Sequence, residues 1–275
     1  MTSQCHTFTL GALRCHILLD GAVTLGREGI LRRYPDASET DYRAAFAAVG
    51  RTLEDADSSF NLLLIETGDA RILVDAGEGG KPNGGGVVES LRLAGMTPDA
   101  ITHILLTHTH RDHVLGLTTL DGAPVFPNAR YVISNQEMAY WRGRVAAGEV
   151  DDAAILAMMD AAGVRLIAMD EQIAPGINAL PLPGHTPGQI GLRIESEGAT
   201  LLHLADALHQ PFQFAHPEWS PTFDLDTSVS VPTRRAALAR AADSDALTLL
   251  YHLTFPGLGR VRRAGEGFVW EKVMR

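Results

Sequence analysis

Four side chains that can bind a metal ion fall within six consecutive positions of this chain, and no other feature constrains its fold as strongly. They are His108, His110, Asp112 and His113. The apolar run Ile101 to Leu106 directly precedes them, and a short apolar run closed by polar residues predicts a buried β-strand. Neutral imidazoles and ionised carboxylates are ligands of zinc and similar divalent cations. The segment therefore predicts a metal centre at a strand end, and the number of ligands favours two ions over one.

The pattern His-x-His-x-Asp-His after an apolar strand resembles the first motif of the metallo-β-lactamase superfamily of hydrolases. A solvated, histidine-rich turn is the alternative, but three later segments resemble the other motifs of the superfamily in the right order. They are the turn 183–188 around His185, the segment 204–207 around Asp206, and the segment 251–259 that contains His252. The resemblance runs from about Phe60 to the C-terminus. It implies an α/β (α+β) fold, a four-layer αββα sandwich, whereas periodicity alone indicates only mixed α and β.

The resemblance also implies how the ligands divide between two metal ions. It assigns His108, His110 and His185 to the first ion and Asp112, His113 and His252 to the second, with Asp206 bridging both. Five histidines and two aspartates suit zinc, which we favour, and also iron, cobalt, nickel or manganese. Asp75 ends a predicted strand and matches an aspartate that usually buttresses the metal site in this superfamily.

A dinuclear centre of this kind predicts a hydrolase. Two cations that share a water lower its pKa towards neutrality, and the resulting hydroxide attacks a carbonyl or phosphoryl centre. Asp112 is placed to orient the hydroxide or to move a proton.

His209 stands where the acyl-homoserine-lactone lactonases of the superfamily carry a tyrosine that holds the substrate oxygen. A histidine there can donate a hydrogen bond or act as a general acid, and a surface or packing role is the alternative.

The segments 210–220 and 255–259 resemble the methyl parathion hydrolase-like branch of the superfamily. That branch implies an apolar pocket for aryl or alkyl esters, lactones and phosphotriesters. The predicted rim comprises Phe212, Phe214, Trp219 and Phe255, with core packing or a dimer contact as the alternative for each. We expect hydrolysis of a small neutral ester, most readily a lactone or carboxylic ester and secondarily a phosphotriester. A thioester or β-lactam hydrolase and a metal-stabilised binding protein without turnover are the other hypotheses.

Composition limits the partners and the compartment. The chain has 275 residues, 45% hydrophobic and 20% charged, and predicts one domain over 1–275. A net charge of −10 disfavours nucleic acid and anionic membranes as partners. Cys5 and Cys15 indicate reduced thiols, and the polar start from Met1 to His6 does not resemble a targeting segment. We therefore expect a cytoplasmic enzyme that acts on a small-molecule ester.

Two segments outside the motifs have local predictions. The region 25–57 lacks a strand pattern, and Tyr42 to Val49 predicts a short helix capped by Ser38 or Thr40. We expect this region to be a lid or a partner surface, such as a homodimer contact, or else a surface packing arm. The glycine-rich segment 77–86 predicts a flexible loop beside the site, because the Lys-Ser/Thr ending of a phosphate-binding loop is absent.

Overall fold

The central strands of this protein are apolar on both faces, and this explains why its sheets are covered on both sides. The structure, a computed structural model, describes residues 4–80 and 85–273. In β3 (Asp57–Thr67), Leu62 and Leu64 pack in one core cluster, whereas Leu63 and Ile65 pack in another. A strand with two apolar faces needs a layer on each of them. The first cluster lies beneath helices and the second lies between two sheets.

The first sheet has seven strands in sequence order from edge to edge. They are β1 (Cys5–Leu10), β2 (Leu13–Thr24), β3, β4 (Ala70–Val74), β5 (His103–Leu105), β6 (Arg130–Ser134) and β7 (Val164–Ile167). The strands β1 to β4 form antiparallel pairs, and β4 to β7 form parallel pairs. The strands from β4 to β7 therefore all end at the same edge of the sheet.

The second sheet also has seven strands, in the order β14-β13-β12-β11-β10-β9-β8. They are β8 (Gln172–Ala174), β9 (Ile177–Pro181), β10 (Ile190–Ser196), β11 (Ala199–His203), β12 (Leu247–Leu249), β13 (Leu258–Ala264) and β14 (Gly267–Lys272). Only β11 and β12 form a parallel pair; the other pairs are antiparallel. The sheet packs against the first through apolar side chains of β9, β10 and β11.

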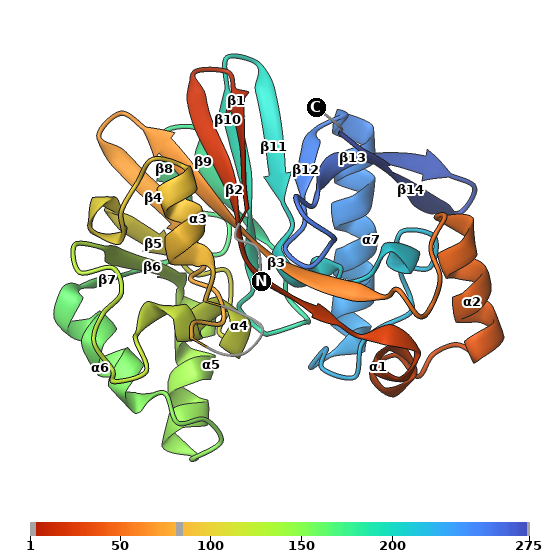
Figure 1. The fold of residues 1–275 in the computed structure, drawn as a ribbon, viewed down its shortest axis with the longest axis horizontal. Coiled ribbons are helices and arrows are strands. Elements are labelled where there is room, and N and C mark those ends of the chain that lie inside the picture. Colours follow the sequence, from red (N-terminus) through yellow and green to blue (C-terminus); the bar gives the residue numbers. More distant parts are fainter. Residues whose placement is uncertain (1–3, 81–84, 274–275) are drawn as a thin grey trace.

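Helices cover the two outer faces of this sheet pair (Figure 1). The first sheet is covered by α3 (Val87–Leu93), α5 (Asn135–Ala146) and α6 (Ala153–Ala162), and the second by α7 (Thr227–Ser244). The buried side chains of Leu91 and Trp141 anchor the first helical layer, and Leu238 anchors the second. This four-layer αββα sandwich confirms the predicted fold class.

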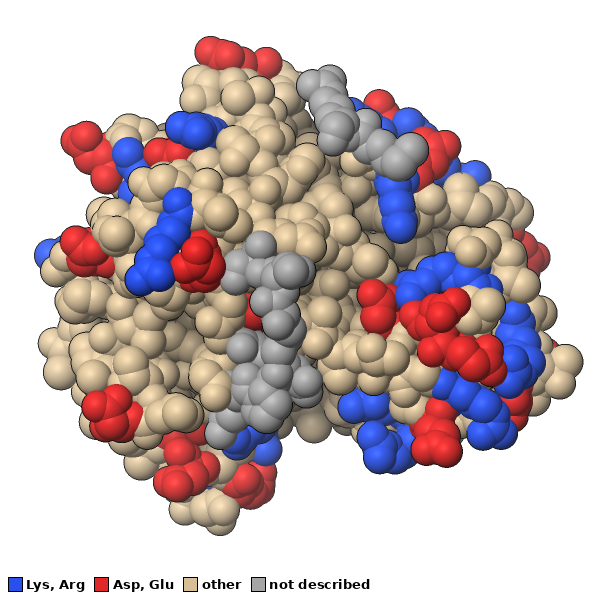
Figure 2. Space-filling view, viewed as in Figure 1, with Lys and Arg blue, Asp and Glu red and all other residues tan. Residues whose placement is uncertain are grey.

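The region 25–57 forms two helices, α1 (Gly26–Arg33) and α2 (Glu39–Ala48). Ser38 caps α2, because its hydroxyl accepts from the N–H of Asp41 and the Asp41 carboxylate accepts from the N–H of Ser38. The buried faces of the two helices pack around Phe212, far along the chain. Acidic and basic side chains are interspersed over this end of the molecule (Figure 2). Roles for this region as a lid or a dimer contact stay predictions.

Three local features of the structure were not predicted: the start of α7, the hairpin of β13 and β14, and the short strand β8. Helix α7 begins at Thr227, where the Asp226 carboxylate accepts from the N–H of Ser228 and caps the helix. Residues 81–84 of the glycine-rich segment lie outside the described residues. Across 4–80 and 85–273, no helix is long and apolar enough to cross a membrane.

The turn after β4 packs against the end of the histidine motif at a position that accepts only glycine. Gly116 follows α4 (Arg111–Val114), and a β-carbon on it would lie 1.9 Å from the carbonyl oxygen of Ala76. The two segments also share a backbone hydrogen bond from the N–H of Gly116 to the carbonyl of Gly77, 2.9 Å long. This contact holds the loop after β4 against the motif.

Gly116→Ala is expected to lower the free energy of unfolding by about 2 kcal/mol, since added atoms in a packed region cost on the order of 1–3 kcal/mol. Gly143→Ala is the matched control: Gly143 lies within α5, and a β-carbon there meets no atom within 4 Å. That change should be neutral or stabilise the helix by up to roughly 1 kcal/mol. Urea denaturation followed by circular dichroism measures both variants, and equal midpoints would contradict the role of Gly116.

Candidate metal centre

The candidate ligands lie at one edge of the sandwich, where strands of both sheets end. The motif residues follow β5, and Asp75 follows the neighbouring parallel strand β4. In the second sheet, His185 follows β9, Asp206 follows β11 and His252 follows β12. These three strands run in the same direction. The sheets therefore bring together loops that are far apart in sequence.

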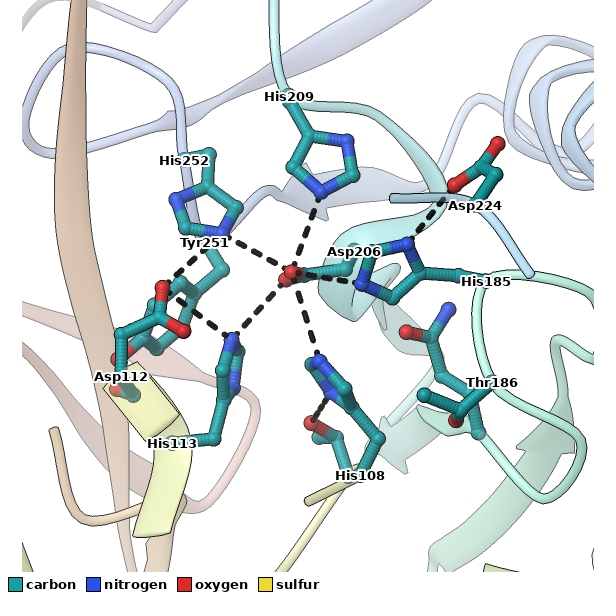
Figure 3. Close-up of polar contacts among 12 residues, drawn as sticks. His108, Asp112, His113, His185, Thr186, Asp206, His209, Asp224, Tyr251 and His252 are labelled. Atoms are coloured by element: carbon teal, nitrogen blue, oxygen red, sulfur yellow. Dashed lines mark hydrogen bonds and ion pairs between the residues drawn. The ribbon is translucent and has the colours of Figure 1, made fainter. Parts of the chain in front are cut away.

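The carboxylate of Asp206 lies at the centre of the cluster (Figure 3). Its Oδ1 lies 3.3 Å from Nε2 of His113. Its Oδ2 lies 2.9 Å from Nε2 of His252, 3.2 Å from that of His209, 3.4 Å from that of His185 and 3.6 Å from that of His108. Asp112 approaches from one side, with Oδ2 at 3.5 Å from His252 and 3.8 Å from His113. The structure thus gathers five of the other six predicted ligands around the carboxylate of Asp206.

The seventh predicted ligand, His110, joins the same cluster, and the side chains form two main groups. His108, His110, His185 and Asp206 offer ligand atoms that all lie within 4.8 Å of one another. Asp112, His113 and His252 form a second group by the same measure, and Asp206, His209 and His252 form a third. The first two groups match the division that the family resemblance implies. The third group adds His209 as a further side chain within reach of an ion.

Unpaired buried atoms indicate that this cluster is built for cations. Among the described residues, Nε2 of His108, His113 and His185 and Oδ1 of Asp206 are buried without a hydrogen-bond partner. Buried polar atoms are normally paired, because leaving them unpaired costs free energy. Imidazole nitrogens and carboxylate oxygens that face one centre suit zinc or another divalent ion. The donor set therefore fits two such ions.

A surrounding layer of acceptors orients the imidazoles. Nδ1 of His113 donates to Asp75 at 2.8 Å, and Nδ1 of His185 donates to Asp224 at 2.8 Å. Nδ1 of His252 lies 3.2 Å from the carbonyl of Ser59. A proton held on Nδ1 leaves the lone pair of Nε2 free to face a metal ion. Asp75 thus contacts the site through a ligand, as the resemblance implies, and it also accepts from the Thr107 N–H at 2.8 Å.

The electrostatics of the cluster divide its imidazoles and keep its central carboxylate charged. Burial and the neighbouring imidazoles lower the pKa of His110 to about 3. Burial alone would raise the pKa of the Asp206 carboxyl, but His252, His113 and His108 hold it well below its ordinary value. His113 and His185 differ, because neighbouring carboxylates outweigh their burial. Asp206, Asp75 and Asp112 raise the pKa of His113 well above its ordinary value. Asp206 and Asp224 raise the pKa of His185 to about 9. Neutral imidazole and ionised carboxylate are the forms that bind metals.

Glu137 ties the two histidine loops together, a role that sequence analysis did not predict. Ser134 and Glu137 have the spacing of a capping box, and Ser134 does cap α5 by accepting from the Glu137 N–H at 3.0 Å. The Glu137 carboxylate, however, is fully buried, and its hydrogen-bond donors lie in the two histidine loops. It accepts from the N–H of Thr109 at 2.9 Å, the hydroxyl of Thr186 at 2.7 Å and the N–H of Gly188 at 3.1 Å. It therefore joins the loop of His108 and His110 to the loop of His185.

Asp224 and Arg234 form a second unpredicted support. The two side chains form a buried ion pair at 2.7 Å. Arg234 also donates to the carbonyls of Ala207 and Pro217, each at 2.6 Å. His185 and Arg234 together hold the pKa of the Asp224 carboxyl below its ordinary value against the effect of burial. No sequence motif surrounds Asp224, so its role is visible only from its contacts with His185 and Arg234 in the structure.

A cavity of about 400 Å³ opens over the cluster. Asp112, Asp206, His209 and His252 form its polar floor, and Phe60 and Phe223 contribute apolar surface. Leu25, Arg33 and Tyr34 from the 25–57 region also line it. The ring of His209 stacks on that of His252 with centroids 4.9 Å apart, and burial lowers the pKa of His209 to about 4. His209 is therefore a neutral side chain that reaches both the cluster and the cavity.

The four aromatic side chains predicted to rim this cavity do not line it, because each packs against other side chains of the protein. Phe212 is buried against α1 and α2, and Trp219 packs edge-on against Tyr42. Phe214 stacks on Trp270 with ring centroids 5.2 Å apart. Phe255 packs at the margin of the core between the sheets. The aromatic side chains of the cavity are instead Tyr34, Phe60 and Phe223, which the sequence motifs did not mark.

Comparison with known proteins places these features in a family. The profile described as the Metallo-beta-lactamase superfamily matches residues 60–252. The crystal structure of AidC, described as a dizinc quorum-quenching lactonase in complex with the product N-hexanoyl-L-homoserine, has a TM-score of 0.90 and 28% identity and covers 99% of each chain. The hydrolase AbOPH of the beta lactamase superfamily has a TM-score of 0.90 and 25% identity, covering 100% of this chain and 99% of its own.

A curated relative, the N-acyl homoserine lactonase AiiA of Bacillus thuringiensis subsp. kurstaki, is 29% identical over 146 residues. That match covers 52% of this chain and 53% of the relative, so it spans about half the length of such relatives. The profile match, by contrast, includes every candidate ligand from His108 to His252. This chain belongs to the metallo-β-lactamase superfamily.

Proposed function

We propose that this protein is a dinuclear metal-dependent hydrolase that opens the ester bond of a lactone. The observation that carries the proposal is the pair of His/Asp groups that share Asp206 at the floor of a cavity large enough for a small ester. The likeness to a dizinc lactonase over nearly the whole chain supports zinc as the metal and a lactone as the substrate. A cytoplasmic location and a homodimer stay predictions.

The ligand roles follow the two groups of side chains. His108, His110 and His185 would hold one ion, Asp112, His113 and His252 the other, and Asp206 both. Bound divalent cations supply an activated water and polarise the carbonyl oxygen of an ester. The Asp206 carboxylate lies against histidines of both groups, 3.4 Å from His185 and 2.9 Å from His252, so it would link the two sites. Its charge, together with that of Asp112, offsets the charge of the cations.

Two side chains of the cavity are placed to act on the substrate. Asp112 lies at the cavity floor and can accept a proton there and deliver it to the leaving alcohol oxygen. His209 is neutral and faces the same space, so its ring N–H can donate a hydrogen bond to a substrate oxygen. A side chain that donates without a charge suits a neutral ester. Both roles require the substrate carbonyl to lie over Asp206.

Replacing the shared carboxylate tests the metal centre. The wild-type protein is expected to bind two zinc ions per chain, and Asp206→Asn to bind fewer than one, because the variant removes the charge that both groups share. Asp243→Asn is the control, since Asp243 is an exposed partner of Arg263 on the surface. Mass spectrometry of the metal content after dialysis measures all three proteins. Two zinc ions retained by folded Asp206→Asn would count against the bridging role.

Replacing His209 tests the substrate role. His209→Phe is expected to lower kcat/KM for N-hexanoyl-homoserine lactone by roughly 10²–10³-fold, the usual effect of losing one donor to a developing oxyanion. Zinc content should stay at two per chain. His216→Phe is the matched control, because His216 stacks on Trp219 and does not line the cavity. A loss of zinc in His209→Phe would instead make His209 a ligand, and unchanged kinetics would remove it from the mechanism.

The same assay separates the rival functions. Activity on the lactone should exceed that on p-nitrophenyl acetate, paraoxon and nitrocefin when all are compared by kcat/KM. A preference for nitrocefin would favour the β-lactam hypothesis. Full zinc occupancy without turnover of any of these compounds would favour a metal-stabilised binding protein.

A further inference from the structure

A second cavity, of about 480 Å³, lies at the opposite end of the parallel strands from the metal centre. It is lined by side chains of β4, β5, β6 and β7, with Ile173 and Ala174 of β8 as the facing wall. None of the candidate metal ligands contributes to it. Its volume falls in the range of roughly 300–1,000 Å³ that accommodates small molecules. The proposed hydrolase activity makes no use of this space.

The register of the sheet explains the composition of the cavity. Ile72 pairs with His103, and His103 pairs with Arg130, on neighbouring parallel strands. Paired residues of adjacent strands point to the same face, and so do residues two positions further along. Leu105 and Val132 therefore continue the same face towards the interior, where both are buried. The result is an apolar floor with polar and charged side chains at its mouth.

The charge at the mouth is positive and only partly balanced. Arg165 pairs with Glu171 at 2.7 Å. Arg130, by contrast, forms no side-chain ion pair or hydrogen bond with any residue that the structure describes. Burial lowers the pKa of His103, and the positive charges of Arg130 and Arg165 lower it further. On a chain with a net charge of −10, this mouth retains a surplus positive charge.

We propose that this cavity binds an amphipathic carboxylate, with the carboxylate paired to Arg130 and the apolar body lying on Ile72, Leu105 and Val132. The planar guanidinium binds a carboxylate through two parallel hydrogen bonds. The half-buried His103 lies in register beside it and is held by a hydrogen bond of 2.9 Å with Thr102 Oγ1. A fatty acid and the acyl-chain acid released by ester hydrolysis share this chemistry.

Calorimetric titration of the zinc-loaded protein tests the site. Octanoate is expected to bind, and 1-octanol to bind at least tenfold more weakly, because it lacks the charge. Arg130→Ala should weaken octanoate binding at least tenfold and leave lactone hydrolysis unchanged. Arg240→Ala is the matched control, an exposed arginine of α7 that does not line the cavity. A second variant, Ala174→Trp, should weaken octanoate binding by narrowing the cleft.

The outcomes are distinct from those that test the metal centre. Octanoate affinity that is equal in wild type, Arg130→Ala and Ala174→Trp would place the carboxylate on the zinc ions and overturn the proposal. Absence of octanoate binding to the wild type would overturn it as well. Titration with N-hexanoyl-homoserine distinguishes the two sources: tighter binding than octanoate that is lost in Arg130→Ala identifies a product site, and weaker binding identifies a fatty-acid site.

Discussion

The carboxylate of Asp206 is nearly inaccessible to solvent, and five imidazole nitrogens surround it at 2.9 to 3.6 Å. His108 and His113 belong to one motif, and the other three imidazoles come from segments further along the chain. Burial of so many polar groups is unfavourable unless they share counter-charges. The convergence of the loops after β5, β9, β11 and β12 therefore depends on what this carboxylate binds. Divalent cations are the partners that satisfy the nitrogens and the oxygens together.

A second layer of acids makes that convergence rigid. Asp75 and Asp224 fix the rings of His113 and His185, and Glu137 joins the two loops that carry the first group of ligands. Glu137 accepts from two backbone N–H groups, so it holds the loops themselves as well as their side chains. Orientation by such partners commonly changes metal affinity by 10–100-fold. These three acids are therefore expected to influence how tightly the histidine ligands bind metal ions.

Four of the candidate ligands could be predicted from sequence because they lie within six positions of one another. The family resemblance supplied His185, Asp206 and His252 and the division into two groups. Supports such as Glu137 and Asp224 could not be predicted, since their partners lie tens of residues away and the sequence around them carries no motif. Glu137 has the local spacing of a capping box with Ser134, but its carboxylate accepts hydrogen bonds from Thr109, Thr186 and Gly188 instead. The predicted aromatic rim of the cavity was wrong for a related reason. Phe212 and Phe214 have the right residue type, but packing partners far along the chain determined where they point.

The parallel strands of the first sheet give the molecule two chemically different ends. Strand direction sends Asp75 and the histidine motif to the carboxyl ends of β4 and β5, where backbone loops are free to turn inward. At the amino ends, the same register places His103 beside Arg130 over an apolar floor. Each end is reached by its own cavity, so a ligand at one need not compete with a ligand at the other. The short strand β5, in which Ile104 and Leu105 are buried, connects His103 at one end to the histidine motif at the other.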